Sequence, residues 1–220
     1  MMTFREMTLK VFRGEPIPHV LFQPRIEPWY DWHKRFGKMP KRYENASLLD
    51  IFDDLRLYEE IISSGVVRIV NFGENIHDQL LSPKYFERYF VPFYEKRSNQ
   101  LRKHGIFTHI HIDGYFMTLL PYLRHLPFDG YEALTPKPQG DVELEEIKEH
   151  IGDKVLIDGI PAIMFIPPFT RDDLMAMVER IVKLFHPRLI LGASDEVPQG
   201  GGEEAIERVR MVAEWCLKVH

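Results

Sequence analysis

Short apolar segments alternate with amphipathic helical segments from about residue 61, and this alternation constrains the fold more than any other feature of the chain. Repeats of this βα kind are typical of a parallel sheet with helices packed on it. Residues 17–24, IPHVLFQP, resemble one more strand ahead of the repeats. We therefore expect an α/β protein with six strands, centred near residues 20, 68, 109, 132, 156 and 190.

Residues 82–105 are expected to form one helix, with Ser82 as its N-cap, Pro83 at its first position and Gly105 at its end. Pro92 lies inside this segment and is expected to kink or divide the helix. Aromatic residues recur at helical spacing here, and core packing is the expected role of this set: Tyr85, Phe86, Tyr89, Phe90 and Phe93.

Composition excludes several classes of protein. The 220 residues suit one domain, with a strand and an aromatic loop in 1–57 and βα units in 58–220. The net charge of -5 argues against a nucleic-acid partner, which calls for a basic surface. We expect no secretory signal, because the first residues are charged from Arg5 onward and have no long apolar core. We also expect no membrane helix, since no apolar run approaches the roughly 20 residues that a span needs. The single cysteine, Cys216, excludes an internal disulfide and a multi-cysteine metal site, so we expect a cytoplasmic protein.

The segment FTHIHIDG places polar residues at every second position of an apolar run. In a strand, His109, His111 and Asp113 would share one face, while Ile110 and Ile112 would share the other. A half-exposed antiparallel strand would show the same alternation without any function. In a parallel sheet, the two isoleucines are expected to pack under helices and the polar residues to face a common interior or cleft.

Each expected strand ends in groups capable of chemistry. In parallel α/β folds the active site lies at the carboxyl ends of the strands. The endings carry, in chain order, Gln23 and Arg25; Asn71, Glu74 and Asn75; His109, His111 and Asp113; Glu132; Asp158; and Ser194, Asp195 and Glu196. From these we take Glu74 and Asp113 as candidate catalytic residues, and Arg25, Asn71, Asn75 and His109 as candidate substrate-binding residues.

Metal chemistry is one interpretation of these groups. Zinc binds imidazole nitrogen and carboxylate oxygen, and a catalytic zinc keeps one position open for the substrate. We expect His111, Glu132 and Asp195 to be three such ligands from neighbouring strands. Asp113 is an alternative ligand, or it orients His111 through a hydrogen bond.

Several segments, taken in their order along the chain, resemble the uroporphyrinogen decarboxylase superfamily. The closer likeness is to its methyltransferase-like members, which serve corrinoid-dependent methyl transfer and demethylation. The likeness covers almost the whole chain, and its strength lies in the number and order of the matching segments: VFRGEPIPHVLFQPRIEPWYDW, NFGENIHDQLLSPKYFERYFVPFYEKR, HIHIDG, DGYEALTPKPQGDVELEEIKEHIGDKVLIDGIPA and LILGASDEVP.

This resemblance implies a TIM-type (β/α) barrel with its pocket at the carboxyl end of the strands. Some methyltransferase members hold zinc with a His-x-Cys pair on one strand and a cysteine from the last strand. The alignment places His111 on the ligand histidine, Asp113 on the first cysteine and Ser194 or Asp195 near the second. Because both cysteines are missing, the resemblance implies an oxygen-rich zinc site. Such a site suits demethylation of a small methoxy- or methylamine-type compound, with a corrinoid supplied by a partner protein.

Length is a second departure from the family. Family members carry a long segment between the parts that resemble Leu57 and Tyr58, including what would be two strands. Its absence agrees with six expected strands where a closed barrel has eight. We therefore expect an incomplete barrel that forms a homodimer, because bare sheet edges are a liability. Aromatic residues of 25–36 and 85–94 are expected to cover an edge or the pocket.

Two alternatives stay open beside a zinc-dependent methyltransferase. A true porphyrinogen decarboxylase would favour several arginines for the carboxylates of its substrate, and only Arg25 is well placed. A non-enzymatic member, acting as an interaction subunit, would keep the fold without a full active site. The missing segment favours this second alternative, and metal content would separate it from the methyltransferase.

Overall fold

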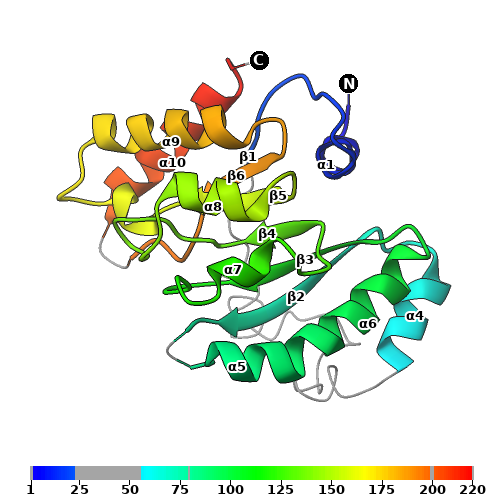
Figure 1. The fold of residues 1–220 in the computed structure, drawn as a ribbon. Coiled ribbons are helices and arrows are strands. Elements are labelled where there is room, and N and C mark those ends of the chain that lie inside the picture. Colours follow the sequence, from blue (N-terminus) through cyan, green and yellow to red (C-terminus); the bar gives the residue numbers. More distant parts are fainter. Residues whose placement is uncertain (1, 23–55, 79, 199–200, 220) are drawn as a thin grey trace, which may run out of the picture.

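One parallel sheet forms the centre of the computed structural model, which describes residues 2–22, 56–78, 80–198 and 201–219 (Figure 1). Its strands lie in the order β1-β6-β5-β4-β3-β2, and every pairing is parallel. The strands are β1 (Leu21–Phe22), β2 (Ile69–Ile76), β3 (Phe107–Ile112), β4 (Gly130–Glu132), β5 (Val155–Ile160) and β6 (Leu189–Ala193). The expected α/β class is confirmed, and each of the six strands contains or adjoins its predicted centre.

Helices alternate with the strands from β2 onward, as the repeats predict. The helices are α1 (Phe4–Arg13), α4 (Arg56–Ser64), α5 (Pro83–Tyr85), the π-helical η2 (Phe86–Phe90), α6 (Val91–Arg102), α7 (Leu120–Leu123), α8 (Leu144–Ile151), the 3₁₀ turn η3 (Ala162–Phe165), α9 (Arg171–Phe185) and α10 (Gly202–Cys216). At the start of α9, Thr170 and Asp173 form a capping box, with each side chain accepting a backbone N–H of the other residue.

The segment that begins at Ser82 is divided, as Pro92 predicts. The Ser82 hydroxyl accepts the Tyr85 backbone N–H as an N-cap, and a wide π-turn then precedes Pro92, which has no N–H for a helical hydrogen bond. The expected core role of the aromatic set is wrong in part. Phe86 is buried and Phe90 is half-buried, whereas the other three side chains are exposed: Tyr85, Tyr89 and Phe93.

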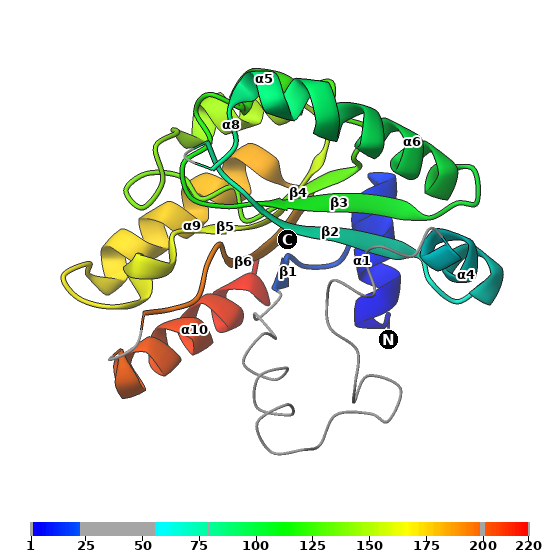
Figure 2. The ribbon, with the colours of Figure 1, turned by 90° about the horizontal axis from the view of Figure 1, so that it is seen from below.

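The two faces of the sheet pack against different helices. On one face Ile110 and Ile112 lie fully buried in the main core, as expected, and Figure 2 shows helices α6, α8 and α9 on this outer side of the curved sheet. On the inner face a smaller cluster joins Phe12 of α1 to Ile157 of β5 and Ile190 of β6. Helix α1 therefore covers the inner face of the sheet.

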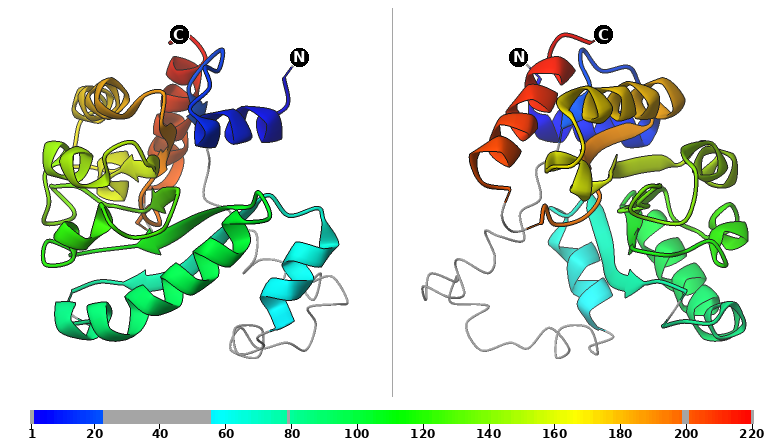
Figure 3. Two further views of the ribbon diagram at one scale, coloured as in Figure 1. Left: turned by 45° about the vertical axis from the view of Figure 1, so that its right-hand side comes forward. Right: turned by 90° about the vertical axis from the view of Figure 1, so that its left-hand side faces the viewer.

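The sheet has two edges, which Figure 3 shows on different sides of the molecule. Strand β2 forms one edge, near α4, and the short β1 forms the other, near α10. The aromatic residues of 25–36 that were expected to cover an edge lie outside the described residues.

The helices also bear on the single cysteine and on the expected absence of a membrane span. Cys216 is buried in α10, and burial raises the pKa of its thiol to about 11. Within the described part of the chain, none of the helices is both long enough and apolar enough to cross a membrane.

Candidate functional site

The inner face of the sheet carries polar side chains on three neighbouring strands. Asn71 of β2 is level with His109 of β3, and His111 of β3 is level with Glu132 of β4. His111 and Glu132 are each 8% exposed, whereas Asn71 is exposed. The cluster therefore combines a buried carboxylate with an opening to solvent on the β2 side.

A single carboxylate oxygen is the centre of this cluster. The Asn71 side-chain amide donates a hydrogen bond of 2.7 Å to Glu132 Oε2. The same oxygen lies 3.5 Å from His109 Nδ1 and 3.7 Å from His111 Nδ1. Both histidines thus face the same group, as the period-2 alternation predicts, and four candidate residues from three strands converge on one point.

Burial controls the charge of His109. It lowers the pKa of His109 to about 4, while the nearby Glu132 acts in the opposite direction and His111 lowers it further. The ring of Phe12, on α1, lies 6.4 Å from the His109 ring between centroids. His109 is therefore a neutral imidazole near pH 7, and α1 forms the apolar floor beneath it.

The backbone departs from regular strand geometry immediately beyond the cluster. Ala133, which follows Glu132, has φ of 62°, and Asp158 on β5 has φ of 74°. The two positions are neighbours, because the Ala133 N–H donates to the Ile157 carbonyl at 3.3 Å. Left-handed backbone at residues with a Cβ is strained and is concentrated at functional sites. Asp158 is 2% exposed. The sequence places Asp158 at the end of an expected strand, but Asp158 is not among the candidate catalytic, substrate-binding or metal-binding residues.

Asp195 lies in a different set of contacts. Its Oδ2 accepts a hydrogen bond of 3.1 Å from Gln139 Nε2, and Gln139 Oε1 accepts the Ile163 N–H at 3.1 Å. Gln139 thus connects the loops that follow β4, β5 and β6. The next residue, Gly140, has no space for a side chain beside the Thr135 carbonyl oxygen, which keeps this loop tight. Gln139 follows no strand directly, and periodicity therefore gives no signal for it.

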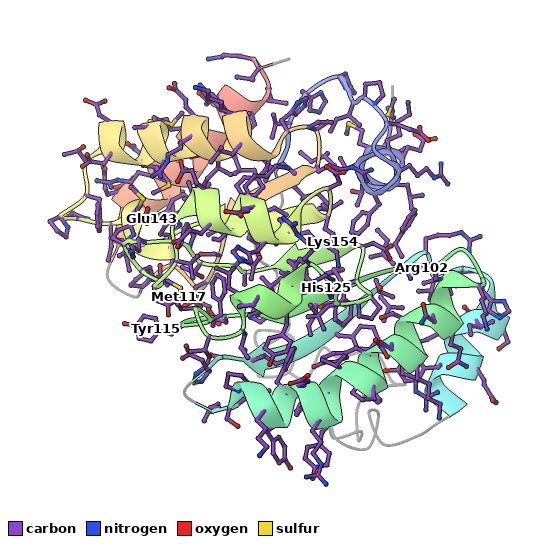
Figure 4. The ribbon with its side chains drawn as sticks, viewed as in Figure 1. Arg102, Tyr115, Met117, His125, Glu143 and Lys154 are labelled. Atoms are coloured by element: carbon purple, nitrogen blue, oxygen red, sulfur yellow. The ribbon has the colours of Figure 1, made fainter. Side chains whose placement is uncertain are left out.

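The loop after β4 makes a second connection through Asp141. The sequence favours this residue as the N-cap of the helix that ends at Gly152, but Glu143 is the N-cap of α8. Asp141 instead accepts hydrogen bonds from the backbone N–H groups of Phe116 and Met117. Figure 4 shows Met117 on the loop that follows β3 and Glu143 at the start of α8.

Other candidate residues are placed as follows. The Asp113 carboxylate accepts the N–H of Gly114 at 2.6 Å, just beyond the end of β3. The Ser194 hydroxyl donates to the Ile160 carbonyl at 3.0 Å, which is a contact within the sheet. The described residues do not include Arg25 or the side chains of two positions near the end of β2: Glu74 and Asn75.

A metal would need at least three well-placed ligands. Among the described residues, no group of three or more His, Cys, Asp or Glu side chains is arranged to hold a metal ion. His111 and Glu132 are neighbours, as predicted, but Asp195 is held by Gln139. The described side chains therefore do not fit the expected three-ligand zinc site.

Compared with models of known protein families and with curated proteins, the chain matches none. The resemblance to the uroporphyrinogen decarboxylase superfamily consequently rests on the order of the sequence segments quoted above.

Proposed function

We propose that this chain is a methyltransferase-like enzyme that removes a methyl group from a small methoxy- or methylamine-type compound. The observation that carries the proposal of an active site is the convergence of Asn71, His109 and His111 on the buried Glu132 carboxylate. The type of reaction is supported by the sequence resemblance. A corrinoid held by a partner protein would supply the methyl acceptor.

An incomplete (β/α) barrel is part of the same proposal. The strands follow one another without interruption from β2 to β6, and β1 then pairs with β6. In a closed barrel the sheet would continue on the other side of β1, through further strands, until it reached β2. The open position thus falls between β1 and β2, where family members carry their additional segment. We propose that a homodimer covers this opening, which sedimentation of the purified chain would test.

Each residue of the cluster has a role in the proposed chemistry. An oxygen or nitrogen atom that loses a methyl group keeps the bonding electron pair and takes up a proton. His111 directs Nδ1 toward Glu132, so its other ring nitrogen is left to exchange that proton with the substrate. Asn71 holds the Glu132 carboxylate in place through its amide. Neutral His109 is suited to hydrogen bonding rather than to proton delivery.

Methyl transfer to free cob(I)alamin tests this function. The purified chain is mixed with reduced cobalamin and a panel of methoxyaromatic compounds and methylamines, and methylcobalamin is followed by its absorbance. We expect product from at least one compound, and a rate about a hundredfold lower in His111→Ala. The matched control is His125→Ala, which removes an exposed histidine labelled in Figure 4. A folded protein that methylates no cobalamin from any compound would favour the non-enzymatic alternative.

Metal content gives a second test. Because Asp195 is bound to Gln139 and not to the His111–Glu132 pair, the proposed reaction does not depend on the zinc expected from the sequence. We therefore expect less than stoichiometric zinc in the purified chain after dialysis, and this result alone would not favour the non-enzymatic alternative. Elemental analysis of wild-type protein and His111→Ala provides the measurement. One zinc per chain that is lost in His111→Ala would instead restore the metal-centred interpretation.

A further inference from the structure

Three exposed aromatic side chains form a line along η2 and the adjoining helices. Tyr85, Tyr89 and Phe93, here called the aromatic stripe, are 53%, 50% and 41% exposed and lie four residues apart. Other large apolar side chains with high exposure lie outside this helical segment: Val66, Leu80, Tyr115, Met117, Ile206 and Leu217. Single exposed apolar residues are common on protein surfaces, whereas aligned aromatic residues indicate an interaction site.

The aromatic stripe is ordered by the helix that carries it. The π-turn over residues 86–90 brings the rings of Tyr85 and Tyr89 to 4.5 Å between centroids. Phe93 is fixed by edge contacts with the buried Phe72, at 6.4 Å, and with Tyr94, at 5.7 Å. These aromatic side chains are therefore ordered before a partner binds, so binding costs them little conformational freedom.

Basic residues accompany the aromatic stripe. Lys84, Arg88 and Lys96 are exposed on the same helical segment, and none of them forms an ion pair with a described residue. The Arg88 guanidinium lies 5.2 Å from the centre of the Tyr89 ring. Elsewhere on the described surface, Arg171 and Arg180 are neutralised by glutamates of this chain. The segment thus keeps three positive charges available in a protein of net charge -5.

We propose that the aromatic stripe and its three basic residues bind an acidic, apolar-faced segment of a partner protein. Tyrosine, phenylalanine and arginine are enriched in protein interfaces, and Tyr and Arg among the residues that dominate binding energy. Nucleic acid is a poorer fit, because its closely spaced phosphates call for a dense basic surface, whereas this chain has a net charge of -5 and its three basic residues are interspersed with Glu87 and Glu95. The stripe lies on the helix that covers the outer side of the sheet, so this proposal is independent of chemistry at Glu132.

A defined peptide tests the proposal. The probe is a fluorescent amphipathic helical peptide with leucine on one face and glutamate on the other, and its counterpart carries lysine in place of glutamate. We expect the glutamate peptide to bind, with an affinity that falls as salt is added. Tyr89→Ala and the charge reversal Arg88→Glu should each weaken binding about tenfold. Matched controls on other elements, Ile206→Ala and Lys183→Glu, should leave it unchanged.

Any of the following outcomes would overturn this assignment. They are equal binding of the lysine peptide, unchanged binding to Arg88→Glu, tighter binding of the stripe to phosphatidylglycerol vesicles or single-stranded oligo(dT), and self-association that Tyr89→Ala abolishes. Absence of glutamate-peptide binding to the folded wild-type chain would also count against it. Thermal unfolding of each variant establishes that a lost signal reflects the surface and not the fold.

Discussion

Two glutamates in this molecule have opposite surroundings. Glu132 is buried on the inner face of the sheet and is contacted by an amide and two imidazoles. Glu204 lies on the surface helix α10 and accepts hydrogen bonds from Arg171 and Arg208, which lower the pKa of its carboxyl to about 2. Guanidinium groups neutralise Glu204 and connect α10 to its neighbours. Glu132 is held by the Asn71 amide and lies beside His111, an imidazole that can exchange protons. The same residue type therefore serves structure in one place and suits chemistry in the other.

Exchanging each carboxylate for its amide should separate these roles most clearly. Glu132→Gln keeps the size of the side chain but removes its negative charge, and we expect the rate of methyl transfer to fall by a factor of about 10² to 10⁴. Glu204→Gln should leave that rate unchanged. Initial rates with the cobalamin assay, compared at equal amounts of folded protein, provide the measurement. A similar loss of rate in both variants would contradict the comparison.

Acid should lower the free energy of unfolding in a different pH range for each region, the one around Glu132 and the one around Glu204. His109 is protonated near pH 4 in the folded chain but near pH 6.5 when unfolded, so the unfolded state binds more protons between these values. The free energy of unfolding should therefore fall by at most about 3 kcal/mol as the pH drops from 6.5 to 4. The lowered pKa of Glu204 acts in a lower window, because its stabilising effect is present above about pH 4.5 and is lost toward pH 2.

Urea unfolding at several pH values tests the contribution of His109. In His109→Gln the loss of stability between pH 6.5 and 4 should become smaller, whereas the exposed control His125→Gln should keep the wild-type slope. A wild-type slope in His109→Gln would show that the acid sensitivity arises elsewhere.

The sequence predicts the scaffold of the site better than its boundaries. Period-2 alternation is sufficient to place His109 and His111 on one face, because side chains of a strand alternate strictly. Strand order then brings Glu132 beside them. The contact between Gln139 and Asp195 depends on how a tight loop folds back over two strand ends, and no local pattern encodes that contact. Of the three predicted metal ligands, Asp195 is therefore the one that the sequence supports least.

Helical spacing shows the same limit on the surface. It correctly aligns Tyr85, Tyr89 and Phe93, but it cannot tell whether that face of the helix meets the sheet or the solvent. Phe86 and Tyr94 occupy the buried side instead. The π-turn before Pro92 has more residues per turn than an α-helix, so it changes which side chains of the two ends of the segment lie on the same face. A regular helical period of about 3.6 residues does not include this change.

The arginines that contact Glu204 offer a comparison within one network. Arg208 is 4% exposed, and its guanidinium also donates to the carbonyl oxygens of Met164 and Phe169. Arg208→Ala should lower the free energy of unfolding by about 2 kcal/mol, because it leaves buried acceptors without donors. Arg171→Ala removes exposed ion pairs and should lower it by less than about 1 kcal/mol. Urea unfolding at pH 7 measures both, and equal losses would refute the distinction.

The smallest expected effect concerns the strained backbone next to Glu132. Ala133 has φ of 62°, a conformation that glycine adopts without steric cost. Ala133→Gly relieves this strain but adds freedom to the unfolded chain, so we expect a net stabilisation of at most about 1 kcal/mol. Ala193→Gly, at the end of β6, is the matched control, because no strain is relieved there and the free energy of unfolding should fall. If Ala133→Gly is stabilised while methyl transfer slows, the strain serves to position Glu132. If both variants lose stability equally, the left-handed geometry at Ala133 carries no strain that the proposed active site could use.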